Sequence, residues 1–274
     1  MQDGNESALI EYYGKFNEEK RLNSRHGRIE YEITMDYIRR IIESSSGRDH
    51  MSDIADIGAG TGRYSVALAQ EYPDVSVTAV ELVRHNLGRI RAKKDALKLG
   101  NLRCYQGNAV NLKKMGDDSA DLTLLFGPMY HLLTEEEKLA AMLEAKRITR
   151  SGGHIMAAYC MNEYAFLIHA IREGNIMSDM SEGKLDESWH VRSCGSELYS
   201  FMRLEDIDRL NQKAGLVRER IFSPDGPANH MRQEINRLTE EEYACFVNYQ
   251  KSVCERYDLI GAGAHTVDVL RVEK

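Results

Sequence analysis

Cysteine and proline are scarce in this chain of 274 residues, and neither forms a pattern. The four prolines build no proline-rich linker, and the five cysteines show no C-x-x-C spacing. Because the cysteines are scattered and odd in number, they form neither a disulfide framework nor a zinc site, and a reducing cytoplasm suits them. They are Cys104, Cys160, Cys194, Cys245 and Cys254.

Long apolar runs are absent as well. No run approaches the ~18 residues that a membrane-spanning helix requires. The first residues, MQDGNESALIEYYG, have neither the basic start nor the apolar centre of a signal peptide. We therefore expect a cytoplasmic protein with no membrane partner.

Positive charge is in deficit, with 36 Lys and Arg against 43 Asp and Glu and a formal net charge of −7. Binding of nucleic acid depends on neutralising phosphates, so no nucleic-acid partner is expected, and only a local basic patch would change this. The basic residues between positions 84 and 94 look like such a patch in isolation, but a solvated helix face is the better interpretation. This helix is predicted over residues 86–97, with Gly100 at its C-terminal end.

Several catalytic motifs are missing. The chain has no G-x-S-x-G elbow, no G-x-x-x-x-G-K-[ST] loop, no H-E-x-x-H and no acidic metal cluster. These absences argue against a serine hydrolase, a P-loop enzyme and a metalloprotease, and no metal is expected.

Residues 54–69 (IADIGAGTGRYSVALA) read as an apolar strand, a glycine-rich turn and a helix. Such a turn points backbone N–H groups at a bound anion, and its glycines let a ligand approach the backbone. Dinucleotide-binding folds use G-x-G-x-x-G, whereas Gly58, Gly60 and Gly62 are spaced G-x-G-x-G and Arg63 occupies the position of the third dinucleotide glycine. An NAD(P)-dependent oxidoreductase is therefore only an alternative.

With Asp56 in front, the D-x-G-x-G-x-G string resembles the first motif of the class I S-adenosylmethionine (SAM) methyltransferases. The resemblance covers roughly residues 53–221 and the last predicted strand, residues 266–272. It implies an α/β fold with a Rossmann-like, doubly wound, seven-stranded sheet in the order 3-2-1-4-5-7-6, the last strand being inserted antiparallel. It also implies SAM as the cofactor and S-adenosylhomocysteine as the product.

Glu81 ends the second predicted strand, 21 residues after Gly60. This spacing is close to the ~20 residues that place a carboxylate at the strand tip, where it can accept from both ribose hydroxyls. The resemblance implies that Asp56 orders the turn and meets the methionine ammonium, and that Asn108 meets the adenine, where the family commonly has an acid. The implied cofactor-binding residues are Asp56, Gly58, Ala59, Gly60, Thr61, Gly62, Glu81, Leu82, Asn108, Ala109, Phe126 and Gly127.

Residues 127–132 (GPMYHL) follow a fourth, fully buried predicted strand. They resemble the family's fourth motif, which faces the reactive methyl group. They lack the N/D-P-P-Y/F form of enzymes that methylate nucleobase or glutamine nitrogens, and they look like a bacterial group of small-molecule methyltransferases. Tyr130 and His131 are the catalytic candidates, as a base for the acceptor's proton. A structural histidine that caps the loop is the alternative for His131.

One domain is expected over residues 1–274, with helical lid segments at 1–50, 161–202 and 223–262. Helices are predicted over residues 28–43 and 165–176, and capping boxes at Thr134 and Thr239 open two more. Tyr12 and Tyr13 either fold over the cofactor or pack at the sheet edge, and Trp189 and His190 either contact substrate or anchor a cap. The candidate substrate contacts are thus Tyr12, Tyr13, Tyr130, Trp189 and His190.

The expected function is SAM-dependent methyl transfer to a small-molecule acceptor with an oxygen or nitrogen nucleophile. Two alternatives stay open besides the oxidoreductase: a methyltransferase acting on RNA or protein, and a non-catalytic SAM-binding protein. Both a monomer and a homodimer are compatible with the sequence.

Overall fold

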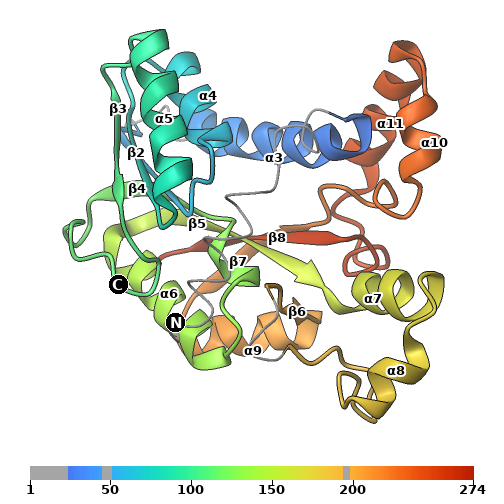
Figure 1. Cartoon of the computed structure of the whole chain (residues 1–274). Helices are drawn as coiled ribbons and strands as arrows, with labels where there is room; N and C mark the ends of the chain where they lie inside the picture. Colours follow the sequence, from blue (N-terminus) through green and yellow to red (C-terminus); the bar gives the residue numbers. More distant parts are fainter. Residues whose placement is uncertain (1–23, 45–50, 194–197) are drawn as a thin grey trace.

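A mixed sheet runs through the molecule with helices on both faces, in a computed structural model that describes residues 24–44, 51–193 and 198–274 (Figure 1). The strands are β1 (Asp53–Ile57), β2 (Ser76–Glu81), β3 (Leu102–Gln106), β4 (Ala120–Leu125), β5 (Thr149–Met161), β6 (Phe201–Met202), β7 (Val217–Phe222) and β8 (His265–Arg271). The helices are α3 (Arg25–Ser44), α4 (Arg63–Glu71), α5 (Arg84–Leu97), η1 (Pro128–Tyr130), α6 (Glu135–Ile148), α7 (Asn162–Ala165), η2 (Phe166–Arg172), α8 (Ile176–Ser181), α9 (Leu204–Ala214), α10 (Arg232–Arg237) and α11 (Glu240–Val253). Within these ranges no helix has both the length and the apolar character that a membrane crossing would demand.

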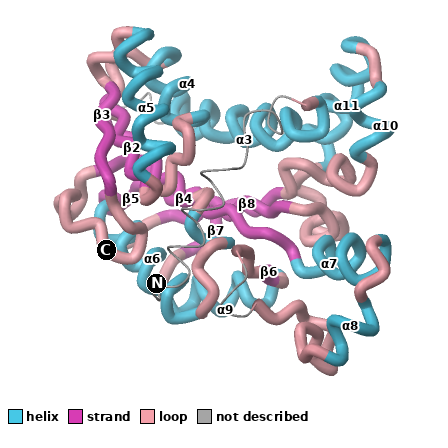
Figure 2. Tube along the Cα trace, in the orientation of Figure 1, coloured by secondary structure: helices cyan, strands magenta, loops and turns pink. Residues whose placement is uncertain are grey.

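The strand order is β3-β2-β1-β4-β5-β8-β7, with the two-residue β6 paired to the end of β5 (Figure 2). Strands β1 to β5 are parallel to their neighbours, whereas β8 lies antiparallel between β5 and β7. When β6 is left out of the numbering, this is the predicted order 3-2-1-4-5-7-6. The Rossmann-like fold and its inserted antiparallel strand are confirmed.

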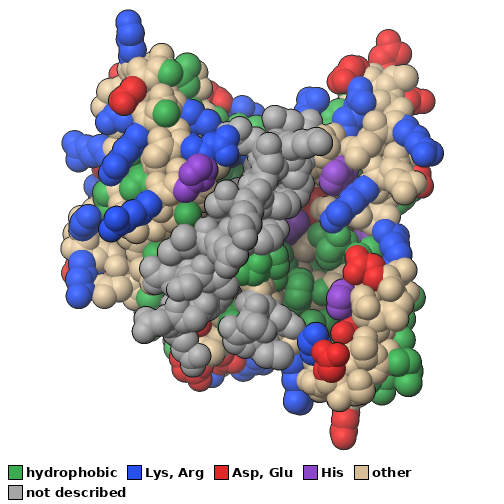
Figure 3. All heavy atoms as spheres, viewed as in Figure 1, with side chains coloured by type: hydrophobic (Ala, Val, Ile, Leu, Met, Phe, Trp, Pro, Cys, Tyr) green, Lys and Arg blue, Asp and Glu red, His purple; other side chains and the backbone are tan. Residues whose placement is uncertain are grey.

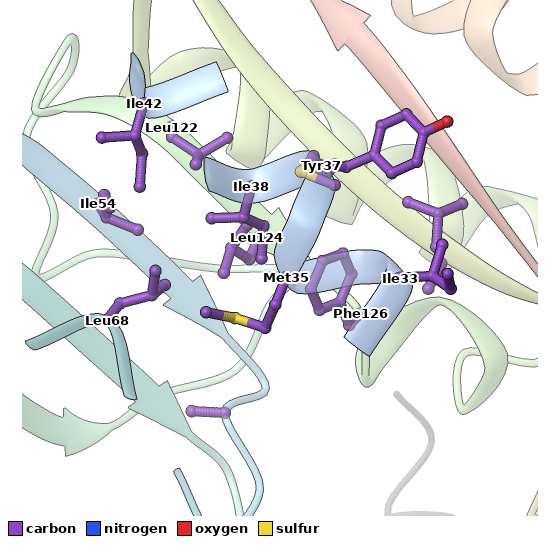
Figure 4. Close-up of a cluster of buried hydrophobic side chains, with 14 of the residues drawn as sticks. Ile33, Met35, Tyr37, Ile38, Ile42, Ile54, Leu68, Leu122, Leu124 and Phe126 are labelled. Atoms are coloured by element: carbon purple, nitrogen blue, oxygen red, sulfur yellow. The ribbon is translucent and has the colours of Figure 1, made fainter. Parts of the chain in front are cut away.

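Both faces of the central strands are covered, so their residues are apolar almost without alternation. Ile54, Leu122 and Leu124 point to the face covered by α3, α4 and α5 (Figure 4). Ile57 and Leu125 point to the opposite face, which α6 and α9 cover. Because β1, β2 and β4 are parallel, their carboxyl ends meet at one edge of the sheet, and the loops that follow these strands lie there.

Helix α3 covers one face of the sheet together with α4 and α5. Its isoleucines recur at helical spacing, and Ile29, Ile33 and Ile38 are fully buried. Each buried side chain of this kind contributes about 1.5–3 kcal/mol relative to an exposed one. Helices α10 and α11, from the predicted 223–262 insertion, pack against α3. This insertion therefore packs against α3, the helix that covers one face of the sheet.

Both predicted capping boxes are present. The Thr134 hydroxyl accepts a hydrogen bond from the Glu137 backbone N–H at 3.2 Å, and the Glu137 carboxylate accepts from the Thr134 N–H. Thr239 and Glu242 repeat the arrangement at the start of α11. Each box satisfies two N–H groups that have no partner within the helix.

Two local predictions were wrong. Helix α5 ends at Leu97, as predicted, but its C-cap is Lys98, which adopts the left-handed conformation (φ 55°) and donates its N–H to the Asp95 carbonyl, so Gly100 does not close the helix. The predicted helix over 165–176 is instead the short α7, a π-helix over 166–172 and α8. Residues 173–175 interrupt it, with Gly174 at a positive φ of 79°.

Asp268 of β8 is fully buried and binds Arg218 of β7 through two hydrogen bonds of 2.7 and 2.8 Å. Asn211 of α9 donates a third, at 2.6 Å. Arg218 also contacts Asp208, whose side chain is 55% exposed. This ion pair joins the inserted strand to the edge strand and to the helix beneath.

We expect Asp268→Ala to lower the free energy of unfolding by about 3 kcal/mol, because it removes the buried partner of a charged group. Asp208→Ala removes an exposed carboxylate from the same guanidinium and should cost less than about 1 kcal/mol. Urea denaturation of the two variants measures both values. Equal losses of unfolding free energy in the two variants would show that burial of the Asp268 carboxylate does not strengthen its ion pair with Arg218.

Candidate active site

The turn after β1 adopts a conformation that only glycine tolerates well. Gly58, Gly60 and Gly62 have φ values of 73°, 56° and 82°. The N–H groups of Gly58 and Ala59 donate to the Val80 carbonyl at 2.8 and 3.1 Å, which ties the turn to the end of β2. The glycine spacing is therefore explained by backbone conformation.

The loop after β4 packs directly on this turn. A Cβ atom on Gly58 would lie 2.5 Å from Pro128 Cδ, and one on Gly127 would lie 2.8 Å from the Gly58 carbonyl oxygen. No side chain fits between the two loops. This close approach places Tyr130 and His131 beside the glycine turn, as predicted from their position after the fourth strand.

Asp56 anchors the start of α4. Its side chain is buried, and Oδ2 accepts a hydrogen bond from the Ser65 N–H at 3.1 Å. Since the N-cap residue Gly62 has no side chain, the Asp56 carboxylate satisfies this helix terminus in its place. Burial raises the pKa of Asp56 to about 6, although the Ser65 hydrogen bonds oppose the shift.

Glu81 lies at the tip of β2 with 5% of its surface exposed. Oε2 accepts from the Gly60 N–H and Oε1 from the Val83 N–H, both at 2.8 Å. Burial raises the pKa of Glu81 to about 7 despite these two hydrogen bonds. A carboxylate has about four acceptor positions, so further donors such as ribose hydroxyls can bind it.

A first cavity opens beside Glu81 and extends to the loop after β3. Asn108 lies in its wall, where the side-chain carbonyl accepts from the Val110 N–H at 3.2 Å and keeps a second lone pair. The apolar part of the wall suits a flat ring such as adenine. The cavity is lined by Gly58, Gly60, Glu81, Leu82, Val83, Asn86, Gly107, Asn108, Ala109, Gly127, Pro128, Tyr130, His131 and Leu132.

A second cavity lies on the other side of the turn, between α3, the start of α4 and the ends of β4 and β5. It shares Gly58, Gly60, Gly127 and Tyr130 with the first cavity, so the two flank the same turn. Its lining also contains Glu30, Tyr31, Asp56, Ala59, Thr61, Arg63, Tyr64, Phe126 and Ala158. All the predicted cofactor residues except Gly62 therefore line one of the two cavities.

Part of this lining was not predicted from the sequence. Val83, Asn86 and Leu132 adjoin predicted residues, and proximity in the chain could have indicated them. Glu30 and Tyr31 belong to a helix expected only to pack or to form a lid, and no local pattern marks them.

His131 is buried in the first cavity, and its Nδ1 lies 2.7 Å from the Leu198 carbonyl oxygen. Because a carbonyl only accepts, Nδ1 carries the hydrogen and the lone pair of the neutral ring is on Nε2. Burial lowers the pKa of His131 to about 4, so the ring is neutral at pH 7. The Tyr130 ring packs against it at 4.6 Å, and Tyr199 covers both.

Two of the other predicted substrate contacts, Trp189 and His190, are not in these cavities. Trp189 packs on Phe166 with a ring separation of 5.8 Å and is 47% exposed. His190 Nε2 lies 3.4 Å from Asp206 of α9. Tyr12 and Tyr13 lie outside the described residues. Substrate contact by these four residues stays a prediction.

A family model of known proteins matches the part of the chain that contains the glycine turn. Residues 54–153 match the family model described as "Methyltransferase domain". A tRNA (guanine-N(7)-)-methyltransferase from Mycobacterium leprae (strain Br4923) is 35% identical over 57 residues, which are 21% of this chain and 25% of that protein. The chain thus spans about a quarter of the length of the curated relatives it matches.

Solved structures match most of the chain. The PH0226 protein from Pyrococcus horikoshii OT3 has a TM-score of 0.60 and 13% identity, covering 96% of this chain and 99% of that one. Geranyl diphosphate C-methyltransferase from Streptomyces coelicolor A3(2), in complex with Mg²⁺, geranyl diphosphate and S-adenosyl-L-homocysteine, has a TM-score of 0.56 and 11% identity, covering 88% and 80%. At these identities the likeness shows the fold.

The pKa of Glu81 predicts a pH dependence of ligand binding. Ribose hydroxyls donate to the ionised carboxylate, so binding of S-adenosylhomocysteine should strengthen as the pH rises towards 7, by up to about tenfold per pH unit, and level off above pH 8. Glu81→Gln cannot ionise and should lose most of this dependence. Calorimetric titration between pH 5.5 and 8.5 measures both profiles, and parallel profiles would contradict the assignment.

Proposed function

We propose that this chain is a class I S-adenosylmethionine-dependent methyltransferase whose acceptor is a small molecule, because residues 54–153 match a methyltransferase domain and the strand order is the one that the fold requires. One observation carries the proposal: a second, partly open cavity is lined by side chains of α3, of α4 and of two strand ends. A small nucleophile could enter such a space, whereas a macromolecule would have to insert a single group. The net charge of −7 also suits an acceptor other than nucleic acid.

The cofactor supplies a methyl group on a positively charged sulfur, which the acceptor attacks in line. Glu81 would hold the ribose, and Leu82, Val83 and Asn108 would surround the adenine. Asp56 would meet the methionine ammonium, and the N-terminal end of α4 would attract the carboxylate. With the partners held in place, orientation supplies most of the rate enhancement.

We assign the base to His131, in line with its place next to the loop after β4. A neutral imidazole with its hydrogen fixed on Nδ1 by the Leu198 carbonyl can take a proton on Nε2. The 1–50, 161–202 and 223–262 segments would form the lid over the acceptor. A cytoplasmic monomer or homodimer is part of the same proposal.

RNA is the second candidate acceptor. The alignment with tRNA methyltransferases favours it, although it covers only 57 residues. Lys and Arg side chains gather over the region of α5 (Figure 3), which begins next to the first cavity. One of them has a structural role, because Lys93 Nζ donates to the Thr61 carbonyl at 2.9 Å.

Incubation with SAM carrying a tritiated methyl group separates these candidates. The purified protein is given pools of small amines, alcohols and acids in one reaction and unmodified tRNA transcripts in another. We expect label in the small-molecule pool and none in tRNA. Label in tRNA alone would establish the RNA alternative, and no label in either would indicate a non-catalytic SAM-binding protein.

Calorimetry provides the cofactor control. Glu81→Ala should weaken binding of SAM and S-adenosylhomocysteine at least tenfold, which is ~1.4 kcal/mol. The exposed Glu136→Ala should leave both affinities unchanged. Binding of NADH by the wild-type protein would instead support the oxidoreductase alternative.

Removal of the proposed base should slow turnover without weakening cofactor binding. We expect His131→Gln to lower kcat by about 10²–10⁴-fold, with the SAM Kd unchanged within threefold. Because the His131 ring is neutral above its pKa of about 4, its contribution to kcat/KM should persist from pH 8 to pH 6 and disappear as the pH falls through 4. A kcat equal to that of the wild type would assign His131 a structural role.

A further inference from the structure

Glu30 of α3 brings a second carboxylate to the cavity that contains Asp56. Its side chain is 24% exposed, and Oε2 lies 3.7 Å from Nδ1 of His265. His265 is the first residue of β8, where it pairs with Cys160 at the end of β5. Because β8 is antiparallel to β5, its first residue lies at the edge where the parallel strands end.

His265 is held from its other side by Asp225. This carboxylate is fully buried, lies 2.7 Å from His265 Nδ1 and accepts from the His265 backbone N–H at 3.2 Å. Asn229 donates to it at 2.7 Å and fixes its position. Burial lowers the pKa of His265, but the charges of Glu30 and Asp225 outweigh burial and raise it well above its usual value. The Nδ1–H of the imidazolium is directed at Asp225, and the charge of the ring attracts the Glu30 carboxylate at 3.7 Å.

Aromatic rings complete the wall around Glu30. The Tyr31 and Tyr64 rings are 5.3 Å apart, and Tyr64 and Phe126 are 4.9 Å apart. The Arg63 guanidinium, which lines the same cavity, lies 4.3 Å from the centroid of the Tyr31 ring, so this ring already binds a cation of the protein. The Tyr64 and Phe126 rings together with the Glu30 carboxylate are surroundings that favour an organic cation. A neutral acceptor that becomes cationic during the reaction gains the same stabilisation as its charge develops.

The methionine part of the cofactor has its own partners on the β1 side, namely Asp56 and the start of α4. Glu30 instead approaches from α3, next to Ala158 of β5. No group of three or more His, Cys, Asp or Glu residues able to hold a metal occurs in the part of the chain that the structure describes. Besides its 3.7 Å contact with His265, the Glu30 carboxylate has further acceptor positions that a donor group of the acceptor can use.

We propose that the acceptor is an amine and that Glu30, positioned by His265 and Asp225, is the residue that selects it. This inference rests on the proposed small-molecule function. The lone pair of the neutral amine forms the N–C bond while the C–S bond breaks and its electron pair stays on sulfur. Glu30 accepts a hydrogen bond from the nitrogen as it becomes positively charged, and the surplus proton then passes to Nε2 of His131 and from there to water. Glu30 contacts substrate, whereas His265 is a positioning residue.

Matched acceptor pairs test the proposal with the tritiated-methyl assay. The two members of each pair differ only in whether the nucleophile is an amine or a hydroxyl group. The pairs are phenethylamine and 2-phenylethanol, glycine and glycolate, and putrescine and 1,4-butanediol. We expect label only in amines. Glu30→Gln should lower kcat/KM for the amine at least 100-fold with the SAM Kd unchanged within threefold, and Glu30→Asp should retain an intermediate activity because it keeps the charge.

Two further measurements separate substrate contact from a structural effect. Glu32→Gln is the matched control, because Glu32 is on the same helix but binds Arg28 and does not line the cavity. It should leave kcat/KM unchanged. In NMR titrations the pKa of the His265 imidazole should fall in Glu30→Gln and Asp225→Asn, and His265→Gln should raise KM for the amine more than it lowers kcat.

Several outcomes would overturn the inference while small-molecule methylation stands. One is label in an alcohol or at a carbon atom, and another is an amine that Glu30→Gln methylates as well as the wild type does. A third is a tenfold loss of SAM affinity in Glu30→Gln, which would assign Glu30 to the cofactor. Label in tRNA alone, or none at all, would overturn the proposed function and this inference together. The two failures are therefore distinguishable.

Discussion

The backbone of the loop after β1 touches the backbone of the loop after β4, because Gly58 and Gly127 leave no side chain between them. Neighbouring parallel strands place their carboxyl ends side by side. The lack of side chains at Gly58 and Gly127 is what lets the two loops come into van der Waals contact. The glycine turn then divides the space above the sheet into two cavities with shared walls. Tyr130 borders both cavities, so the proposed cofactor and acceptor would meet across this turn.

The acids of the site are kept from solvent before any ligand arrives. Asp56 and Glu81 are both buried, and burial raises the pKa of each into the range of 6 to 7. Shifts of this kind cost stability and are typical of functional sites. Backbone N–H groups of the glycine turn and of α4 offset part of the cost. The same hydrogen bonds fix the carboxylates in the orientation that a cofactor requires.

Features encoded by spacing along the chain could be predicted from the sequence. The glycine turn, Glu81 at the strand tip and the two capping boxes each depend on residues within about 20 positions of one another. The strand order came from the resemblance to a family. Glu30 could not be found this way, because its role depends on a contact with His265 that leaves no periodic pattern. The residue that closes α5 was predicted wrongly as Gly100, because Lys98, rather than a glycine, takes the left-handed conformation.

The antiparallel direction of β8 has a consequence for the order in which the site is assembled. Residues 56–131 contain most of the cofactor wall, whereas the acceptor wall joins Glu30 of α3 to His265 of the last strand. Contacts between residues so far apart form late, because a long stretch of chain must be ordered first. Most residues proposed to hold the cofactor precede β5 in the chain, whereas the proposed acceptor wall would be complete only once β8 has entered between β5 and β7. A chain that lacks β8 would therefore lack the residue proposed to position Glu30.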